Sequence, residues 1–238
     1  MRTKTTSIDN TPTITPFCLP VYSDEQKTKL LRYAKQILDI QNQIQQSNHP
    51  NILHHTLEHN DKHQRRRHYP KGDRIDHQHG GQYFYHCHRD NPTTTEHGHF
   101  HCFVRQENIP KRLPRIQALP EPSNHPMTHL VAISMNQFGQ PMRLFTVNRW
   151  VTDDVWYDAQ YMPQLIQRFK IAPNDTSPWY LIDQWIAGML ALFAPQIYWL
   201  HQQRGACYQD LNTEDKSVEE LSSIDINLSE QIHWLIDD

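Results

Sequence analysis

The chain has 238 residues, of which 37 % are hydrophobic, and its 23 basic and 26 acidic residues give a formal net charge of −3. A chain of this length can bury a substantial core. No apolar run approaches the roughly 18 residues of a membrane helix, and the net charge does not favour nucleic-acid binding. We therefore expect neither a membrane nor a nucleic-acid partner, while the oligomeric state is left open.

The composition divides the chain into three parts. Residues 1–22 begin with a segment rich in Thr and Pro that lacks an apolar signal-peptide core, so we expect a disordered lead-in. Residues 23–212 are expected to form a single α+β domain. Residues 213–238 are acidic but carry several large apolar side chains, Trp234 among them, which predicts a segment docked on that domain.

The four cysteines give no sign of a disulfide framework. They are Cys18, Cys87, Cys102 and Cys207, and no two of them form a CxxC pair. This pattern favours a reducing, cytoplasmic location.

Two helices are predicted before the histidine-rich region. From Asp24 to Ile44 the apolar residues recur at helical spacing, and Ser23 with Gln26 has the pattern of a capping box. Residues 51–66 indicate a second, more polar helix after Pro50. Its histidines between His54 and His63 include pairs spaced four apart, which can chelate a metal, but a solvated polar face is the preferred interpretation.

The rest of the chain predicts strands followed by helices. Residues 68–73 are typical of a turn, 129–135 and 142–151 of strands joined as a hairpin, and 155–157 of a short extension of the sheet. Helices are expected over 162–171, 179–193 and 196–203, with a break at Pro195. The predicted fold class is therefore α+β, with a small antiparallel sheet flanked by N- and C-terminal helices.

Histidine is concentrated in one part of the sequence, since thirteen of the seventeen fall between His49 and His101. Residues 82–88 and 96–103 both alternate like strands, and side chains two apart share a face. His86 and His88 are thus in phase on the first strand. The second strand carries three more in phase, His97, His99 and His101.

An antiparallel register that opposes His86 to His99 and His88 to His97 puts both sets on one face. Opposed residues have Cβ atoms roughly 4.5–5.5 Å apart, so their imidazoles can reach one ion. We expect a mononuclear site that uses three or four of these five histidines and holds Zn, Fe, Ni or Cu. Other groups close enough in sequence to contribute are His68, Asp73, His77, His79 and Glu96. Glu96 is out of phase with His97 and would need a bulge to join.

Residues 97–103 also resemble the histidine-triad signature, His-x-His-x-His. That resemblance implies a nucleotidyl hydrolase or transferase in which His99 is the nucleophile. Gly98 stands where that family has an apolar residue, the family's upstream Gly-Gln segment is missing, and the resemblance leaves His86 and His88 without a role. A cupin-like enzyme also carries His-x-His on a strand, but its following glutamate is absent after His88 and His99.

Longer motifs resemble an uncharacterised bacterial protein family. They are His68-Tyr69-Pro70-x-Gly72-Asp73, Gln82-Tyr83-Phe84-Tyr85-His86-x-His88-Arg89, Glu96-His97-Gly98-His99-Phe100-His101 and Leu144-Phe145-Thr146-x-Asn148-Arg149-Trp150-Val151-Thr152. The resemblance runs from about residue 25 to the C-terminus and implies no known activity. It does place the histidines and Arg149 in one module, where Arg149 can clamp a carboxylate or phosphate of a small-molecule substrate. The alternative for Arg149 is a surface residue beside a core tryptophan.

The sequence thus favours a metal-binding cytoplasmic protein, and we expect it to be an enzyme with an open position on the metal. The other hypotheses are the histidine-triad enzyme and a closed metal-binding module without catalysis.

Overall fold

The computed structural model describes residues 16–47, 49–57, 67–87, 95–116, 126–207, 213 and 215–237. The predicted lead-in lies mostly outside these residues, and so do the second half of the predicted polar helix and His88. None of the helices in the described ranges is long and apolar enough to cross a membrane.

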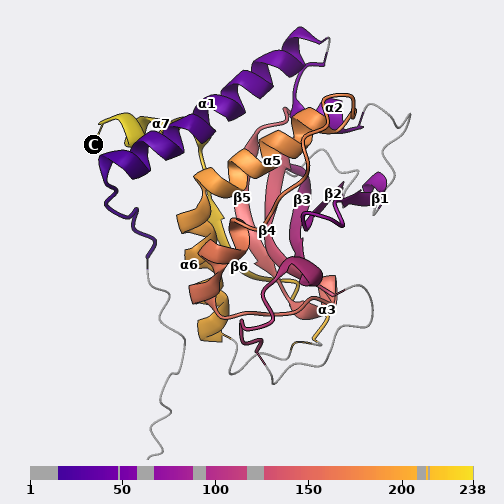
Figure 1. Cartoon of the computed structure of the whole chain (residues 1–238), viewed down its shortest axis with the longest axis vertical. Coiled ribbons are helices and arrows are strands. Elements are labelled where there is room, and N and C mark those ends of the chain that lie inside the picture. Colours follow the sequence, from indigo (N-terminus) through magenta and orange to yellow (C-terminus); the bar gives the residue numbers. More distant parts are fainter. Residues whose placement is uncertain are drawn as a thin grey trace, which may run out of the picture.

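The elements follow the α+β order predicted from the sequence (Figure 1). The strands are β1 (Tyr69–Ile75), β2 (Gly81–His86), β3 (Glu96–Arg105), β4 (Met127–Asn136), β5 (Pro141–Val147) and β6 (Glu220–Asp225). The α-helices are α1 (Asp24–Gln46), α2 (Ile52–Leu57), α3 (Arg149–Thr152), α4 (Met162–Ile166), α5 (Tyr180–Leu192), α6 (Ala194–Cys207) and α7 (Leu228–Asp237). Short 3-10 turns occupy Gln106–Asn108 and Ala159–Tyr161.

All six strands form one antiparallel sheet in the order β1-β2-β3-β4-β5-β6. Each strand therefore pairs with its neighbours in sequence, and the long connection between β5 and β6 contains the helices α3 to α6. The described part of the C-terminal segment supplies β6, which pairs with β5, and α7, in which Leu235 is buried. The division of the chain at residues 22 and 212 stays a prediction.

Helices from both ends of the chain cover one face of the sheet. Trp185 of α5 packs against Phe100 of β3, with ring centroids 5.8 Å apart. The first helix, α1, lies on the outer side of α5, where the Gln36 amide donates a hydrogen bond of 3.0 Å to the Gln184 carbonyl (Figure 1). The predicted capping box at Ser23 is present. Because side chains alternate along β3, the neighbours of Phe100 point to the opposite face.

Four of the expected element boundaries are wrong, one of them because the helix expected over 162–171 ends at Ile166. Residues 69–75 form a strand, although their composition is that of a turn: Gly72 and Asp73 have positive φ, and the pairing of β1 with β2 shifts there. The strand expected over 142–151 ends at Val147, because Asn148 caps the short helix α3. Residues 155–157 add no strand, and Tyr157 forms only an isolated bridge to Arg115.

A buried histidine joins α6 to the sheet and makes the fold sensitive to acid. The His201 side chain is 1 % exposed, and its Nε2–H donates a hydrogen bond of 2.7 Å to the Leu130 carbonyl. Burial, followed by the nearby charge of Arg204, holds the His201 pKa well below its usual value. The folded protein therefore keeps this imidazole neutral at a pH where the unfolded chain protonates it.

Replacing His201 with Gln is expected to flatten the acid side of the stability profile. Since only the unfolded state takes the proton, His201 costs up to about 1.4 kcal/mol of unfolding free energy per pH unit below about pH 6.5. Urea denaturation of chelator-treated protein between about pH 7 and pH 5 measures the slope. Parallel slopes for wild type and His201→Gln would contradict the assignment.

Candidate metal centre

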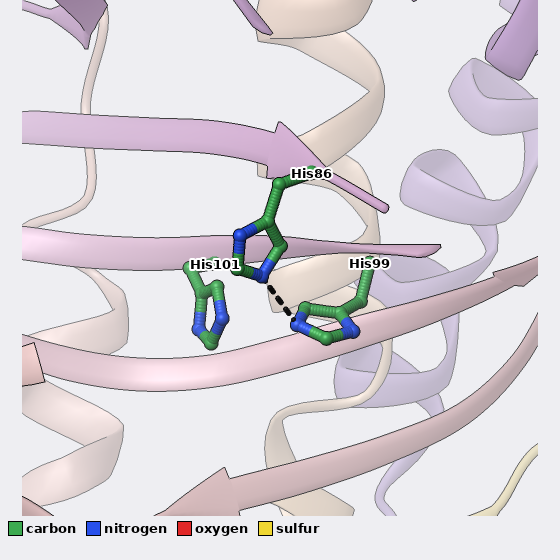
Figure 2. Close-up of side chains that lie close together, drawn as sticks. All are labelled: His86, His99 and His101. Carbon is green, nitrogen blue, oxygen red and sulfur yellow. Dashed lines mark hydrogen bonds between the residues drawn. The ribbon is translucent and has the colours of Figure 1, made fainter. Parts of the chain in front are cut away.

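Three histidines converge on the sheet face opposite α5 (Figure 2). His86 ends β2, while His99 and His101 belong to β3. One ring nitrogen of each lies within 4.8 Å of the other two. All three are buried, with 9 %, 3 % and 1 % of their surfaces exposed.

The strand register accounts for this convergence. His86 pairs directly with His99, as the alternation predicts, and their Nε2 atoms are 2.8 Å apart. His101 is two residues further along β3 and therefore shares the face. Metal bonds of 2.0–2.1 Å need nitrogen ligands about 3 Å or more apart, so the first two rings must separate by a few tenths of an ångström to admit an ion.

A bulge at the start of β3 changes which residues reach this face. The pairing of β3 with β4 shifts between Glu96 and Gly98. The shift brings the Glu96 carboxylate to His99, where Oε1 is 2.9 Å from Nδ1. It also places His97 on the other face, with its Nδ1 2.7 Å from the Tyr85 hydroxyl. The sequence predicted that Glu96 could reach the histidine face only if β3 contained a bulge, and the bulge is present. The same bulge keeps His97 away from His86, His99 and His101.

Besides His99 of its own strand, the Glu96 carboxylate is held by two groups from neighbouring strands. Ser134 Oγ donates to Oε2 at 2.6 Å, and Arg143 Nη2 lies 3.3 Å from the same atom. Burial acts to raise the Glu96 pKa, but the contacts with His99, Ser134 and Arg143 outweigh it and lower that pKa to about 2. An ionised carboxylate at Nδ1 selects the tautomer of His99 that leaves Nε2 with its lone pair.

His101 has a corresponding partner on the next strand. Its Nδ1 lies 3.1 Å from Nε2 of His129 in β4. Burial, then the charges of Arg204 and His99, lower the His129 pKa to about 3, so its ring is neutral and can accept a hydrogen bond. Sequence reasoning missed this neighbour. The available signal was a histidine on the strand that follows β3.

Aromatic rings enclose the three histidines. Phe145 of β5 lies edge-on to His99 with centroids 5.0 Å apart, and Phe84 of β2 lies 5.0 Å from His101. At the edge, the His68 ring stacks on Phe84 at 3.6 Å, and Asp73 bonds His68 Nδ1 at 2.8 Å. Apolar rings therefore lie against the imidazoles, and the polar pair of His68 and Asp73 lies at the margin of the cluster.

The other sequence candidates lie apart from the three histidines or outside the described residues. Arg149 is 4 % exposed in α3, and its Nη2 lies 3.1 Å from Asp153. His79 bonds Asp76 at 3.0 Å in the turn between β1 and β2. His88 is outside the described ranges, so its proposed pairing with His97 stays a prediction. A ligand role for any of these residues likewise stays a prediction.

Gly98 permits the close approach of β2 and β3 beside the site. A methyl group at this position would collide with the His86 carbonyl oxygen and would lie 2.6 Å from the Tyr85 hydroxyl. Gly98→Ala is therefore expected to lower the unfolding free energy by about 1–3 kcal/mol, as overpacking does elsewhere. Chemical denaturation provides the measurement.

Gly205→Ala is the matched control for that substitution. No atom lies within 4 Å of the added methyl group, and the residue belongs to helix α6, so this change should be neutral or stabilise the protein by up to about 1 kcal/mol. Equal stabilities of the two variants would rule out a steric role for Gly98.

Comparison with known proteins gives a family without an assigned activity. No curated protein and no solved structure matches the chain. The model of a domain of unknown function, DUF6969, matches residues 31–230, which include the whole sheet and every residue of the site. This chain is a member of that family.

Proposed function

We propose that this protein holds one transition-metal ion on His86, His99 and His101 and that the ion is the centre of an enzyme. The observation that carries the proposal is the carboxylate–imidazole pair of Glu96 and His99 beside two further imidazoles. Metal-ligating histidines commonly donate their second ring N–H to a carboxylate, which orients the ring and raises its basicity. A set of three imidazole ligands is compatible with Zn, Fe, Ni or Cu.

Three protein nitrogens favour an enzyme over a closed structural site. A three-histidine set leaves at least one position for water or substrate, whereas structural zinc sites have four protein ligands. When bound there, a metal supplies Lewis-acid chemistry and lowers the pKa of water. Phe84 and Phe145 limit access of bulk water, while Glu96 and His129 keep His99 and His101 in the tautomers that bind through Nε2.

The histidine-triad alternative has less support. Its three histidines must act together, but the bulge separates His97 from His99 and His101. Nε2 of His99 also faces His86 at 2.8 Å. The remaining alternative is a metal-binding module that does no chemistry, and it differs from the enzyme in having no exchangeable position.

Cobalt substitution tests the proposal and separates these alternatives. Elemental analysis of untagged protein should give one tightly bound transition metal per chain. Apoprotein should take up one tightly bound Co²⁺, and the visible spectrum of that ion should be lost in His86→Ala/His99→Ala. Azide added to the Co²⁺ protein should change that spectrum if a position is open. Uptake without an azide response would favour the closed module, and absence of metal at these histidines would overturn the proposal.

Glu96→Gln should weaken metal binding without removing it. Replacing a carboxylate that holds a ligating histidine typically costs about 10–100-fold in metal affinity. Competition with a chromophoric chelator measures the dissociation constant. Glu107→Gln is the control, because that carboxylate bonds Arg105 at 2.7 Å and touches none of the three histidines in the described contacts. Equal affinities of the two variants would remove Glu96 from the site.

A further inference from the structure

Two histidines at the corner between α1 and α2 lie close enough to share an ion. His49 follows the end of α1, and His54 belongs to the first turns of α2. Their Nδ1 atoms are 3.3 Å apart. We propose that His49 and His54 form a second, exchangeable binding site for a divalent transition metal, separate from the three-histidine centre.

The distance between the two nitrogens is also the distance expected between two adjacent ligands of one metal ion. Two ligands at 2.0–2.1 Å from a tetrahedral ion are about 3.3 Å apart. The two Nδ1 atoms therefore already have the spacing of two adjacent ligands, which the 2.8 Å pair of His86 and His99 does not. The remaining ligands at such a corner would be water molecules.

The backbone around the pair is held in place by the rest of the fold. The Asn51 side chain accepts the His54 backbone N–H at 2.8 Å, and the His49 backbone N–H bonds the Ile44 carbonyl at 3.3 Å. Ile52 and Leu53 anchor α2 in the core. Two ligands on fixed segments need little reordering when they bind, which favours affinity.

A third imidazole supports the pair from the protein side. The His55 ring lies edge-on to the His49 ring, with centroids 5.0 Å apart. Its Nε2 lies 3.1 Å from the Pro178 carbonyl oxygen, and such a bond to a carbonyl requires the proton on Nε2. The neutral ring consequently keeps its lone pair on Nδ1. His55 packs against His49 and limits the rotation of that ring.

The chemistry selects borderline transition metals over hard cations. Two neutral imidazoles suit Zn²⁺, Ni²⁺ and Cu²⁺, whereas Mg²⁺ and Ca²⁺ take oxygen ligands. His54 is exposed, so an ion there exchanges with solvent more readily than one enclosed by the aromatic rings of the three-histidine centre. We therefore expect the His49–His54 site to bind its ion more weakly, and to exchange it faster, than the three-histidine centre does.

Zn²⁺ titration calorimetry on four full-length apoproteins tests the second site. They are wild type, His86→Ala/His99→Ala, His49→Ala/His54→Ala and the variant with all four changes. His86→Ala/His99→Ala should keep a weak Zn²⁺ equivalent, and the fourfold variant should lose it. His233→Ala, which removes an exposed histidine on α7, is the control and should bind as wild type does. Circular dichroism verifies that each variant is folded.

The four titrations keep the two sites distinguishable. If His86→Ala/His99→Ala binds as much Zn²⁺ as wild type does, the three-histidine centre is contradicted. The corner site is then tested separately, by whether His49→Ala/His54→Ala loses a Zn²⁺ equivalent. If the fourfold variant keeps the same Zn²⁺ equivalent as His86→Ala/His99→Ala, the corner site is overturned. Mg²⁺ at the same concentration should give no heat in any of the proteins, and Mg²⁺ binding lost in His49→Ala/His54→Ala would contradict the imidazole chemistry.

Discussion

Removing metal from the purified protein is expected to lower its melting temperature by about 8–16 °C. An ion that binds only the native state at a free concentration about 1,000 times its dissociation constant adds about 4 kcal/mol of stability. One kcal/mol shifts the melting temperature of a chain of this size by roughly 2–4 °C. Differential scanning fluorimetry with and without chelator measures the shift. The three histidines can deliver this effect because they are buried and form a site only in the folded chain.

The double variant His86→Ala/His99→Ala should respond far less to the chelator. A weak ion at His49 and His54 adds little at the same free metal concentration, so the chelator response reports mainly on the buried centre. His79→Ala serves as the control, because that histidine sits in a turn and bonds Asp76. A wild-type melting curve that the chelator leaves unchanged, with no metal by elemental analysis, would contradict a metal centre.

Much of the site could be predicted from two short strands. Alternation fixed the pairing of His86 with His99 and the shared face of His101, because each strand of a buried sheet has only two faces. The same rule failed for His97. A bulge inserts one residue and reverses the phase of everything before it, and no local signal in residues 96–98 distinguishes a bulge from a regular strand apart from Gly98.

The parts of the fold that sequence reasoning missed depend on distant contacts. β6 pairs with β5 although more than seventy residues separate them in the chain. The local sequence of either strand therefore does not show that the two pair. Tyr69–Ile75 contains residues typical of turns and is a strand because β2 provides its partner. The chain ends β5 early because the Asn148 side chain accepts the backbone N–H of Arg149, a cap that also turns Arg149 away from the strand.

A second large effect is expected where β1 and β2 meet α5. Arg74 holds the Asp183 carboxylate with two nitrogens: Nη2 lies 2.8 Å from Oδ2, and Nε lies 3.1 Å from both oxygens. The Tyr83 hydroxyl donates to Oδ1 at 2.8 Å. The side chain of Asp183 is 1 % exposed and that of Arg74 is 23 % exposed. This pair therefore joins the sheet to the helix in a largely desolvated place.

Arg74→Met should lower the unfolding free energy by about 3–5 kcal/mol, because removing one partner leaves the other charge buried without compensation. Urea denaturation at neutral pH measures the loss. Arg74→Met/Asp183→Asn should recover part of it, since no unpaired charge then remains, while Lys35→Met, which breaks an exposed pair with Asp39, should cost less than about 1 kcal/mol.

The pH dependence of Arg74→Met distinguishes lost charge compensation from lost packing. Burial raises the Asp183 pKa above its usual value, although the contacts with Arg74 and Tyr83 act to lower it. Loss of the Arg74 guanidinium should therefore raise this pKa further. A carboxyl whose folded pKa lies above its unfolded pKa takes up a proton on folding, so acid favours its folded state. The deficit of Arg74→Met relative to wild type should therefore shrink as the pH falls from 7 toward about 5. A deficit that stays constant over that range would mean that Arg74 stabilises the protein by packing and not by its charge.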